Sequence, residues 1–291
     1  MSNTLVGLAI GDALGAPFET QHFTSTALAG WSGQYLGSQY HGTRPGEGTD
    51  DTLMTLALAE VLAVNKDYDP EKAGAKYVEA FFANPGRGWG KATQAALERL
   101  RNGSSWVASG SPSEGNGSAM RAAPFGLRYE FKDAIVWAMV DAVITHDRPE
   151  AKEGSAAIAG AISLLRANVS PLEVVSRLAE ELNPSMIRRK IRNLLSQKWE
   201  STLQVCLAMG TGAHVIETVP AALGTLLTAK GFEDAVKDVI LAGGDTDTTA
   251  AIVGALWGTF SPIPERWLTG LNPAVRSQAE RLQVALTSDH L

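Results

Sequence analysis

The sequence predicts an all-α protein, a compact bundle of many helices. Apolar residues recur at three- and four-residue spacing from one end of the chain to the other, and the alternating runs typical of β-strands are nearly absent. Small residues are frequent in the predicted helices, as in the segment 156–161, and they let helices approach closely. The chain shows neither a low-complexity linker nor a fixed-period repeat, so we expect a single domain over residues 1–291.

Helices can be placed from their apolar faces and from their first residues. A helix that starts near Asp50 carries an apolar stripe made of Leu53, Met54, Ala57, Leu58, Val61 and Leu62. Asp69-Pro70 predicts an N-cap and first helical residue for a helix that reaches Phe82, and Arg148-Pro149 predicts the same for a helix that reaches about Arg166. Further helices are expected at 91–102, 131–145, 171–181, 201–209, 218–229, 245–258 and 273–286.

Two segments without helical periodicity are expected to be loops. Residues 20–48 contain six glycines, and a loop of that length in a compact domain is usually functional. Residues 103–118 are rich in glycine and serine, so backbone N–H groups in this segment could face an anion.

The composition excludes several classes of function. The chain has 25 basic and 31 acidic residues, a net charge of -6 and no extended basic run, so we expect no binding to a nucleic-acid backbone. The single cysteine, Cys206, excludes an internal disulfide framework, and its apolar neighbours predict a small buried side chain. The N-terminus has no basic start and soon meets Asp12, which predicts neither a signal peptide nor a membrane span, and therefore a cytoplasmic location.

Two clusters of hydroxyl and carboxylate side chains stand directly before predicted helices. They are the segments 49–52 (TDDT) and 243–249 (GGDTDTT). Helix capping explains the first cluster when it is taken alone, and an acid in the first turn stabilises a helix by about 0.3–1 kcal/mol. Capping needs only one such side chain, however, and crowded carboxylates repel one another unless a cation compensates them.

The two clusters together match the needs of a pair of divalent cations. Asp50, Asp51, Asp245 and Asp247 supply four negative charges, which balance two dications. No combination of histidine and cysteine has the spacing of a zinc site. The clusters therefore predict two Mg²⁺ ions, with Mn²⁺ as a possible substitute.

Five motifs follow one another in an order that points to a known family. They are the segment 11–15 (GDALG) followed by Glu19, then TDDT, then 115–121 (GNGSAMR), then 145–149 (THDRP), then 243–250 (GGDTDTTA). In that order and spacing, the chain closely resembles the ADP-ribosylglycohydrolases over essentially its whole length. The fold of that family is an orthogonal bundle of many α-helices, which agrees with the helical periodicity.

The resemblance implies a set of metal ligands and two candidates for proton transfer. The ligands on one side of the metal pair would be Thr49, Asp50 and Asp51, and those on the other side Asp245, Asp247 and Thr248. Glu19 matches a family glutamate on a loop beside the site, although its neighbours alone would make it a surface carboxylate. Glu19 and the metal-bound Asp247 are both candidates for the general acid or base.

The resemblance also implies which residues bind the substrate. The turn that binds the diphosphate in the family would here consist of Ser113, Gly115, Asn116, Gly117 and Ser118. His146 matches a histidine near the distal part of the substrate, although a histidine after an apolar helix is also explained by the helix dipole. Gly90 belongs to a possible substrate loop, which a simple turn explains nearly as well. Arg121 is interpreted as structural, bridging helix ends.

Two positions depart from the pattern of the family. Gly48 precedes TDDT where relatives often have a larger or aromatic side chain, which puts the shape of the floor of the site in question. Glu114 stands where some relatives carry an aromatic residue. An acid beside a diphosphate is unfavourable unless its side chain points away.

The resemblance implies hydrolysis at the anomeric carbon of an ADP-ribosyl group, with release of ADP-ribose. The substrate would be an ADP-ribosylated protein or a small ADP-ribose conjugate, and the group that carries the ADP-ribose stays open. Two alternatives are kept: a two-metal phosphohydrolase acting on a nucleotide, and a non-catalytic relative that binds ADP-ribose. We expect the protein to be a monomer.

Overall fold

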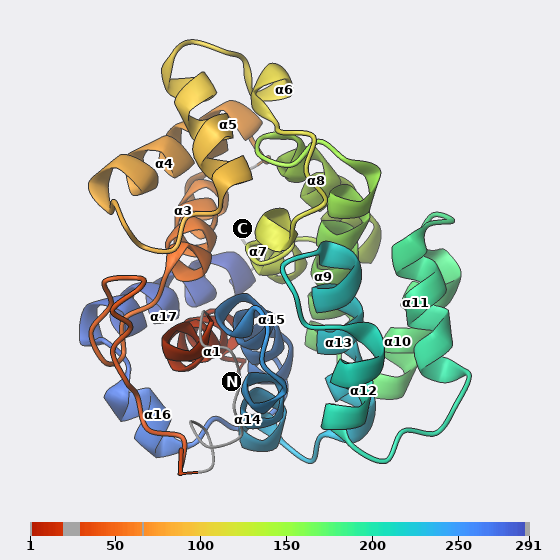
Figure 1. Ribbon diagram of the computed structural model, residues 1–291. Helices are drawn as coiled ribbons and strands as arrows, with labels where there is room; N and C mark the ends of the chain where they lie inside the picture. The colour runs from red at the N-terminus through yellow and green to blue at the C-terminus, as the bar shows by residue number, and fades with distance from the viewer. Residues whose placement is uncertain (1, 20–29, 66, 289–291) are drawn as a thin grey trace.

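The computed structural model describes residues 2–19, 30–65 and 67–288, and these form 16 α-helices and no β-strand (Figure 1). The helices are α1 (Thr4–Gly15), α3 (Asp50–Val64), α4 (Pro70–Ala83), α5 (Lys91–Arg101), α6 (Trp106–Ser109), α7 (Ala123–Arg128), α8 (Phe131–Val143), α9 (Pro149–Arg166), α10 (Pro171–Glu181), α11 (Met186–Leu195), α12 (Thr202–Met209), α13 (Val215–Thr228), α14 (Phe232–Ala242), α15 (Thr246–Gly258), α16 (Glu265–Gly270) and α17 (Pro273–Thr287). Two single-turn 3₁₀ helices, η1 (Ala16–Phe18) and η2 (Asn116–Ser118), complete the described elements.

Helix α1 packs against α15 in the middle of the molecule (Figure 1). Every residue of α1 is buried, and three glycines four residues apart face α15. A β-carbon at Gly11 would overlap the carbonyl oxygen of Ala250, and one at Gly7 would overlap that of Gly254. The two backbones therefore touch, which only glycine permits at these positions.

The antiparallel contact brings the end of α1 to the start of α15. The Thr246 hydroxyl donates a hydrogen bond of 2.8 Å to the carbonyl oxygen of Gly15. Asp12, one turn earlier on α1, reaches the start of α3 and accepts hydrogen bonds from Thr49. Parts of three helices that are far apart in the sequence thus meet at one place, and each carries carboxylates to it.

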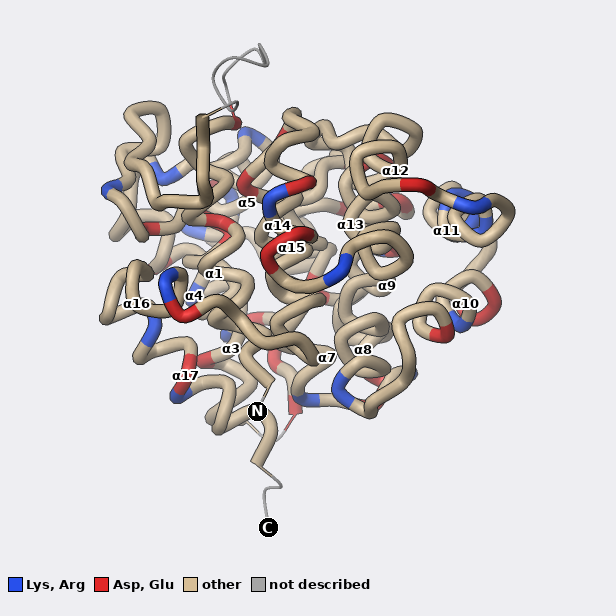
Figure 2. Tube along the Cα trace, turned by 90° about the horizontal axis from the view of Figure 1, so that it is seen from below, with Lys and Arg blue, Asp and Glu red and all other residues tan. Residues whose placement is uncertain are grey.

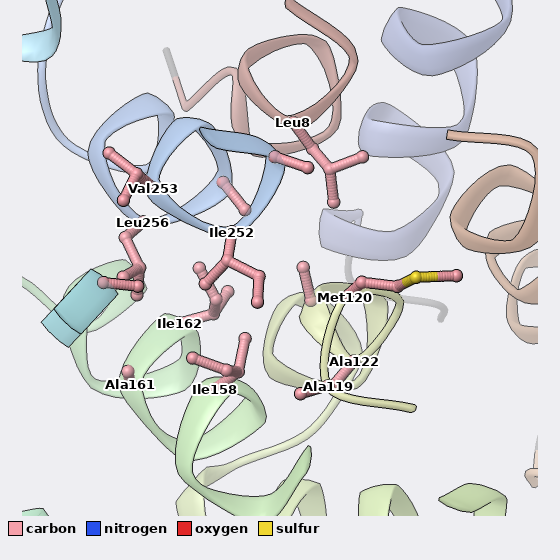
Figure 3. Packing of buried hydrophobic residues seen from close by; sticks show 14 of the residues in the cluster. Leu8, Ala119, Met120, Ala122, Ile158, Ala161, Ile162, Ile252, Val253 and Leu256 are labelled. Carbon is pink, nitrogen blue, oxygen red and sulfur yellow. The ribbon is translucent and has the colours of Figure 1, made fainter. Parts of the chain in front are cut away.

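Apolar side chains of α1, α9 and α15 and of the segment after η2 meet in the buried core (Figure 3). Ile158 and Ile162 of α9 face Ile252 and Leu256 of α15, and Leu8 lies on the α1 side of this group. Each buried side chain of this size contributes about 1.5–3 kcal/mol to folding. The core therefore holds in place the helices whose ends carry the polar clusters.

Charged residues lie mainly on the outer helices (Figure 2). Over the described residues, acidic and basic side chains are mixed, and a short basic group, residues 188–192, lies on α11. None of the described helices is both long and apolar enough to span a membrane.

The predicted helices are all present, and α13 begins three residues earlier than expected. Six helices of the described residues were not predicted: α1, α6, α7, α11, α14 and α16. Helix α1 is apolar on every side because it is buried on every side, so it lacks the amphipathic stripe that identifies a surface helix. Helix α11 is rich in arginine and keeps only Ile187, Ile191 and Leu194 buried.

Both predicted loops are largely irregular. In the first, residues 30–48 form no helix and contain one isolated bridge between Ser38 and Thr43, while residues 20–29 lie outside the described part of the chain. The second, residues 103–118, contains the short helix α6 and the turn η2. Cys206 is buried, as expected, and burial raises the pKa of its thiol to about 12.

The close packing of α1 and α15 predicts that Gly11→Ala destabilises the protein. The added methyl group must push α1 away from the Ala250 carbonyl, and overpacking of this kind costs about 1–3 kcal/mol. Gly74→Ala is a matched control, since Gly74 is also helical but its β-carbon would lie 3.4 Å from Leu100 Cδ1. Urea unfolding should show a lower free energy of unfolding for Gly11→Ala but not for Gly74→Ala. Equal unfolding midpoints for the two variants would contradict the close contact between α1 and α15.

Candidate functional site

Asp12 anchors the first carboxylate cluster. It is fully buried, and its carboxylate accepts hydrogen bonds from the backbone N–H and hydroxyl of Thr49, at 2.8 and 2.9 Å, and from those of Thr52, at 3.0 and 2.5 Å. An acid from α1 therefore helps to cap α3. Asp12 was not among the predicted site residues, although a carboxylate in an otherwise apolar helix was a signal for a role in the site.

The same carboxylate explains the glycine before TDDT. A β-carbon at Gly48 would lie 2.5 Å from both Asp12 Oδ2 and Thr52 Oγ1. The position has no room for a side chain, so the floor of the site is formed by backbone here.

The first cluster has the geometry of a helix start. Thr49 is the N-cap of α3, and its hydroxyl accepts from the Asp51 N–H and lies 3.1 Å from Asp51 Oδ2. The Asp50 N–H donates to the carbonyl oxygen of Arg87 at 2.8 Å. Capping thus uses the hydroxyl of Thr49, and the carboxylates of Asp50 and Asp51 are not needed for it.

The second cluster also forms the start of a helix, and it contacts the first cluster. Asp245 is the N-cap of α15 and accepts from the Thr248 N–H at 3.3 Å. The Thr248 hydroxyl donates to Asp51 Oδ2 across the junction of the two helices, at 3.3 Å. The structure therefore brings together all six residues that the sequence suggested as metal ligands.

Burial and mutual repulsion make these carboxylates costly to ionise. Burial raises the pKa of Asp50, Asp51 and Asp247 well above the usual range, and neighbouring carboxylates raise each pKa further. Asp51 Oδ1 and Asp247 Oδ1 are buried without a hydrogen-bond partner among the described residues. A buried polar atom without a partner costs about 1–3 kcal/mol, so this arrangement fits one that binds cations.

His41 joins this group from the first loop, and it was not among the predicted site residues. Its Nε2 lies 2.5 Å from Glu19 Oε2 and 3.7 Å from Asp247 Oδ2. A β-carbon at Gly88 would come within 2.8 Å of His41 Nδ1, so the glycine leaves room for the imidazole. Glu19, expected beside the site, is indeed close to Asp247.

A cavity of about 220 Å³ opens from the carboxylates. Its lining includes Glu19, Asp50, Gly90, Ser113, Gly115, Asn116, Gly117, His146, Asp245, Asp247 and Thr248. A larger cavity of about 480 Å³ lies between α3, α4 and α17 and is lined by Val61, Val64 and Leu282 among others. The smaller cavity is the better candidate, because it collects the buried polar groups that the fold does not otherwise use.

Two residues of the predicted diphosphate turn differ from expectation. Asn116 lines the cavity, but its Nδ2 donates to Asp245 Oδ2 at 2.8 Å and to Thr218 Oγ1 at 3.0 Å. It therefore supports a carboxylate of the metal cluster as well as facing the cavity. Ser118 is buried and donates to the Ala151 carbonyl at 3.2 Å, outside the cavity lining, because the 3₁₀ turn directs it toward α9.

His146 lies under this turn and lines the cavity. Burial and the nearby charge of Arg121 lower the pKa of His146 to about 3, so its ring is neutral at physiological pH. A β-carbon at Gly117 would lie 2.7 Å from the ring, which requires glycine in the turn.

Arg121 has the structural role expected of it. Its guanidinium is buried and donates to Asp141 Oδ2 at 2.8 Å, to the Asp141 carbonyl at 3.1 Å and to the Gly117 carbonyl at 2.6 Å. Tyr68 and Tyr77 donate to the other oxygen of Asp141, each at 2.7 Å. This network fixes the turn 116–118 relative to α8.

Glu114 is paired with Arg148 at the rim of the cavity. Its Oε1 accepts a hydrogen bond of 3.1 Å from the guanidinium, and both side chains are partly exposed. The acid is thus neutralised and is absent from the cavity lining.

Comparisons with known proteins agree with the site. The family model for ADP-ribosylglycohydrolase matches residues 2–290. An ADP-ribosylarginine hydrolase Tri1 of Serratia proteamaculans is 31% identical over 92% of this chain and 74% of its own. The ADP-ribosyl-[dinitrogen reductase] glycohydrolase of Rhodospirillum rubrum is 26% identical over 97% of this chain and 93% of its own.

Two further relatives match almost end to end. An uncharacterized protein of Archaeoglobus fulgidus is 32% identical over 99% of this chain and 96% of its own. A solved structure titled "ADP-ribosylglycohydrolase-related protein complex" superimposes with a TM-score of 0.76 and 29% identity, covering 98% of this chain and 95% of the other. The chain belongs to the ADP-ribosylglycohydrolase family.

Proposed function

We propose that this ADP-ribosylglycohydrolase uses two divalent metal ions, Mg²⁺ with Mn²⁺ as a substitute, to hydrolyse the bond at the anomeric carbon of an ADP-ribosyl group. The observation that carries the proposal is the meeting of two helix starts with four buried aspartates, two of which have oxygens without partners. Carboxylate and hydroxyl oxygens are the ligands that hard divalent cations select. The metal ligands would be Thr49, Asp50, Asp51, Asp245, Asp247 and Thr248.

The residues around the ions would divide the work of hydrolysis. When bound, the ions lower the pKa of a water molecule and orient the ribose hydroxyls. Glu19 lines the cavity beside Asp247 and would accept the proton of the attacking water, with Asp247 as the alternative base. The bond from the anomeric carbon to the leaving group would break as the bond to the water oxygen forms, through an oxocarbenium-like state. The leaving group would take the bonding electrons and accept the proton that Glu19 removed from the water.

The turn around Gly115 and Gly117 would bind the diphosphate. The turn lines the cavity and has no side chain in the way at either glycine. His146, neutral beneath it, would contact the distal part of the substrate, and Gly90 would border the other side. The cavity volume is below the ~300–1,000 Å³ of typical ligand pockets, so the described residues enclose part of an ADP-ribosyl group.

The substrate is proposed to be an ADP-ribosylated protein or a small ADP-ribose conjugate. Relatives carry names that refer to ADP-ribosylarginine and to ADP-ribosyl-[dinitrogen reductase]. We further propose that residues 1–291 act as one domain, because the buried hydrophobic residues of the described part form one cluster from α1 to α17. We also propose that the protein is a monomer.

Product analysis tests the reaction. Incubation with a panel of ADP-ribosylated proteins and small conjugates in Mg²⁺ should release free ADP-ribose, identified by mass spectrometry. Release of AMP or phosphate instead would identify a phosphohydrolase, and ADP-ribose binding without any product would identify a non-catalytic relative. Either result would overturn the proposed reaction.

Removing the metals should lower the melting temperature, because ions that bind only the folded protein stabilise it by mass action. The decrease in melting temperature on metal removal should be larger at higher pH. The raised pKa of the buried aspartates means that the metal-free fold loses stability as pH rises above their ordinary value, when the protons leave and the carboxylates repel. Calorimetry with and without a chelator, at mildly acidic and mildly alkaline pH, measures both effects. An unchanged melting curve after verified metal removal would contradict the proposal.

Asp247→Asn should lower metal occupancy and turnover together, since it removes charge from a proposed ligand. Glu19→Gln should lower kcat about 10²–10⁴-fold, the usual scale for general acid–base catalysis. Glu130→Gln, a change at an exposed carboxylate, is the control. Single-turnover rates and metal content measured for all three variants separate the roles. A near-wild-type rate for Glu19→Gln would leave proton transfer to Asp247.

A further inference from the structure

His41 is buried beside two carboxylates of the candidate site. Its side chain is 1% exposed, and neither ring nitrogen has a hydrogen bond among the described residues. Buried imidazoles normally use both nitrogens, because an unpartnered polar group in the interior is costly. The close polar neighbours of the ring are thus carboxylates of the candidate metal site, and these groups can share a cation with it.

The ring lies against two carboxylates, each of which has a buried oxygen without a hydrogen bond. Nε2 is 2.5 Å from Glu19 Oε2 and 3.7 Å from Asp247 Oδ2, while Glu19 Oε2 and Asp247 Oδ1 are buried without hydrogen bonds. A nitrogen and an oxygen bound to one metal ion at about 2.0–2.2 Å are at most about 4.4 Å apart. One donor atom from each of the three residues can therefore reach a single ion.

We propose that His41 is a nitrogen ligand, through Nε2, of the ion bound at Asp247, beside Glu19, and that this half of the site selects Mn²⁺ over Mg²⁺. The inference rests on the proposed metal site and goes beyond its all-oxygen ligand set. Mg²⁺ binds oxygen and keeps much of its water, whereas imidazole suits transition metals. A nitrogen ligand from His41 would therefore bind Mn²⁺ more tightly than Mg²⁺.

Glu19 keeps its proposed part in proton transfer under this arrangement. The Oε2 atom of Glu19 is buried beside His41, and Glu19 also lines the cavity. The other oxygen can accept the proton of the water.

The test is binding of Mn²⁺ and Mg²⁺ to untagged protein, read by metal analysis and by pulsed electron paramagnetic resonance of bound Mn²⁺. The wild type should show nitrogen coupling to Mn²⁺, and the coupling should change when histidine is labelled with ¹⁵N. His41→Gln should lose the coupling and bind Mn²⁺ about 10–100-fold more weakly, with a smaller change for Mg²⁺. His214→Gln, a change at an exposed histidine, should retain both properties.

The outcomes separate this inference from the proposed function. Two bound ions without histidine coupling in the wild type would overturn the role of His41 and leave the binuclear site intact. Failure of the wild type to bind either ion would overturn both. The isotope experiment needs no substitution, so it decides the question even if His41→Gln does not fold. Coupling that persists in a folded His41→Gln protein and disappears in His146→Gln would assign the ligand to His146 and also overturn the inference.

Discussion

The contact between α1 and α15 is the constraint on which the site depends. Glycines at Gly7 and Gly11 let the backbones of two central helices touch, and this places the end of α1 beside the start of α15. Asp12 then reaches α3, and Asp247 enters the same space from α15. A larger side chain in this contact would separate the helices and move the carboxylates that they carry.

Electrostatic interactions partly stabilise the cluster of aspartates at the starts of α3 and α15. The starts of α3 and α15 carry positive dipole ends, and threonine hydroxyls and backbone N–H groups bond several of the carboxylate oxygens. These interactions satisfy Asp12 and largely satisfy Asp245, but they leave oxygens of Asp51 and Asp247 without partners. Bound cations would neutralise the remaining negative charge. Without cations, burial and repulsion between the carboxylates raise the pKa of Asp51 and Asp247.

The substrate side of the cavity is organised by a separate network. Arg121, which is paired with Asp141, donates a hydrogen bond to the turn 116–118. The neutral ring of His146 packs against the same turn. Glu114 is paired with Arg148, so this acid is not among the residues that line the cavity.

The sequence by itself determined the helical class, most helix bounds and the family, because periodicity, capping residues and ordered motifs are local properties of the chain. It also indicated both aspartate clusters, since each exceeds what a helix cap needs. Only the tertiary structure decided which groups meet: Asp12 as the cap of α3, His41 between Glu19 and Asp247, and Asn116 on Asp245. These contacts join residues up to 206 positions apart, as for His41 and Asp247, and no local pattern records such distances. Helix α1 shows the same limit, because burial on every side removes the periodic stripe from its sequence.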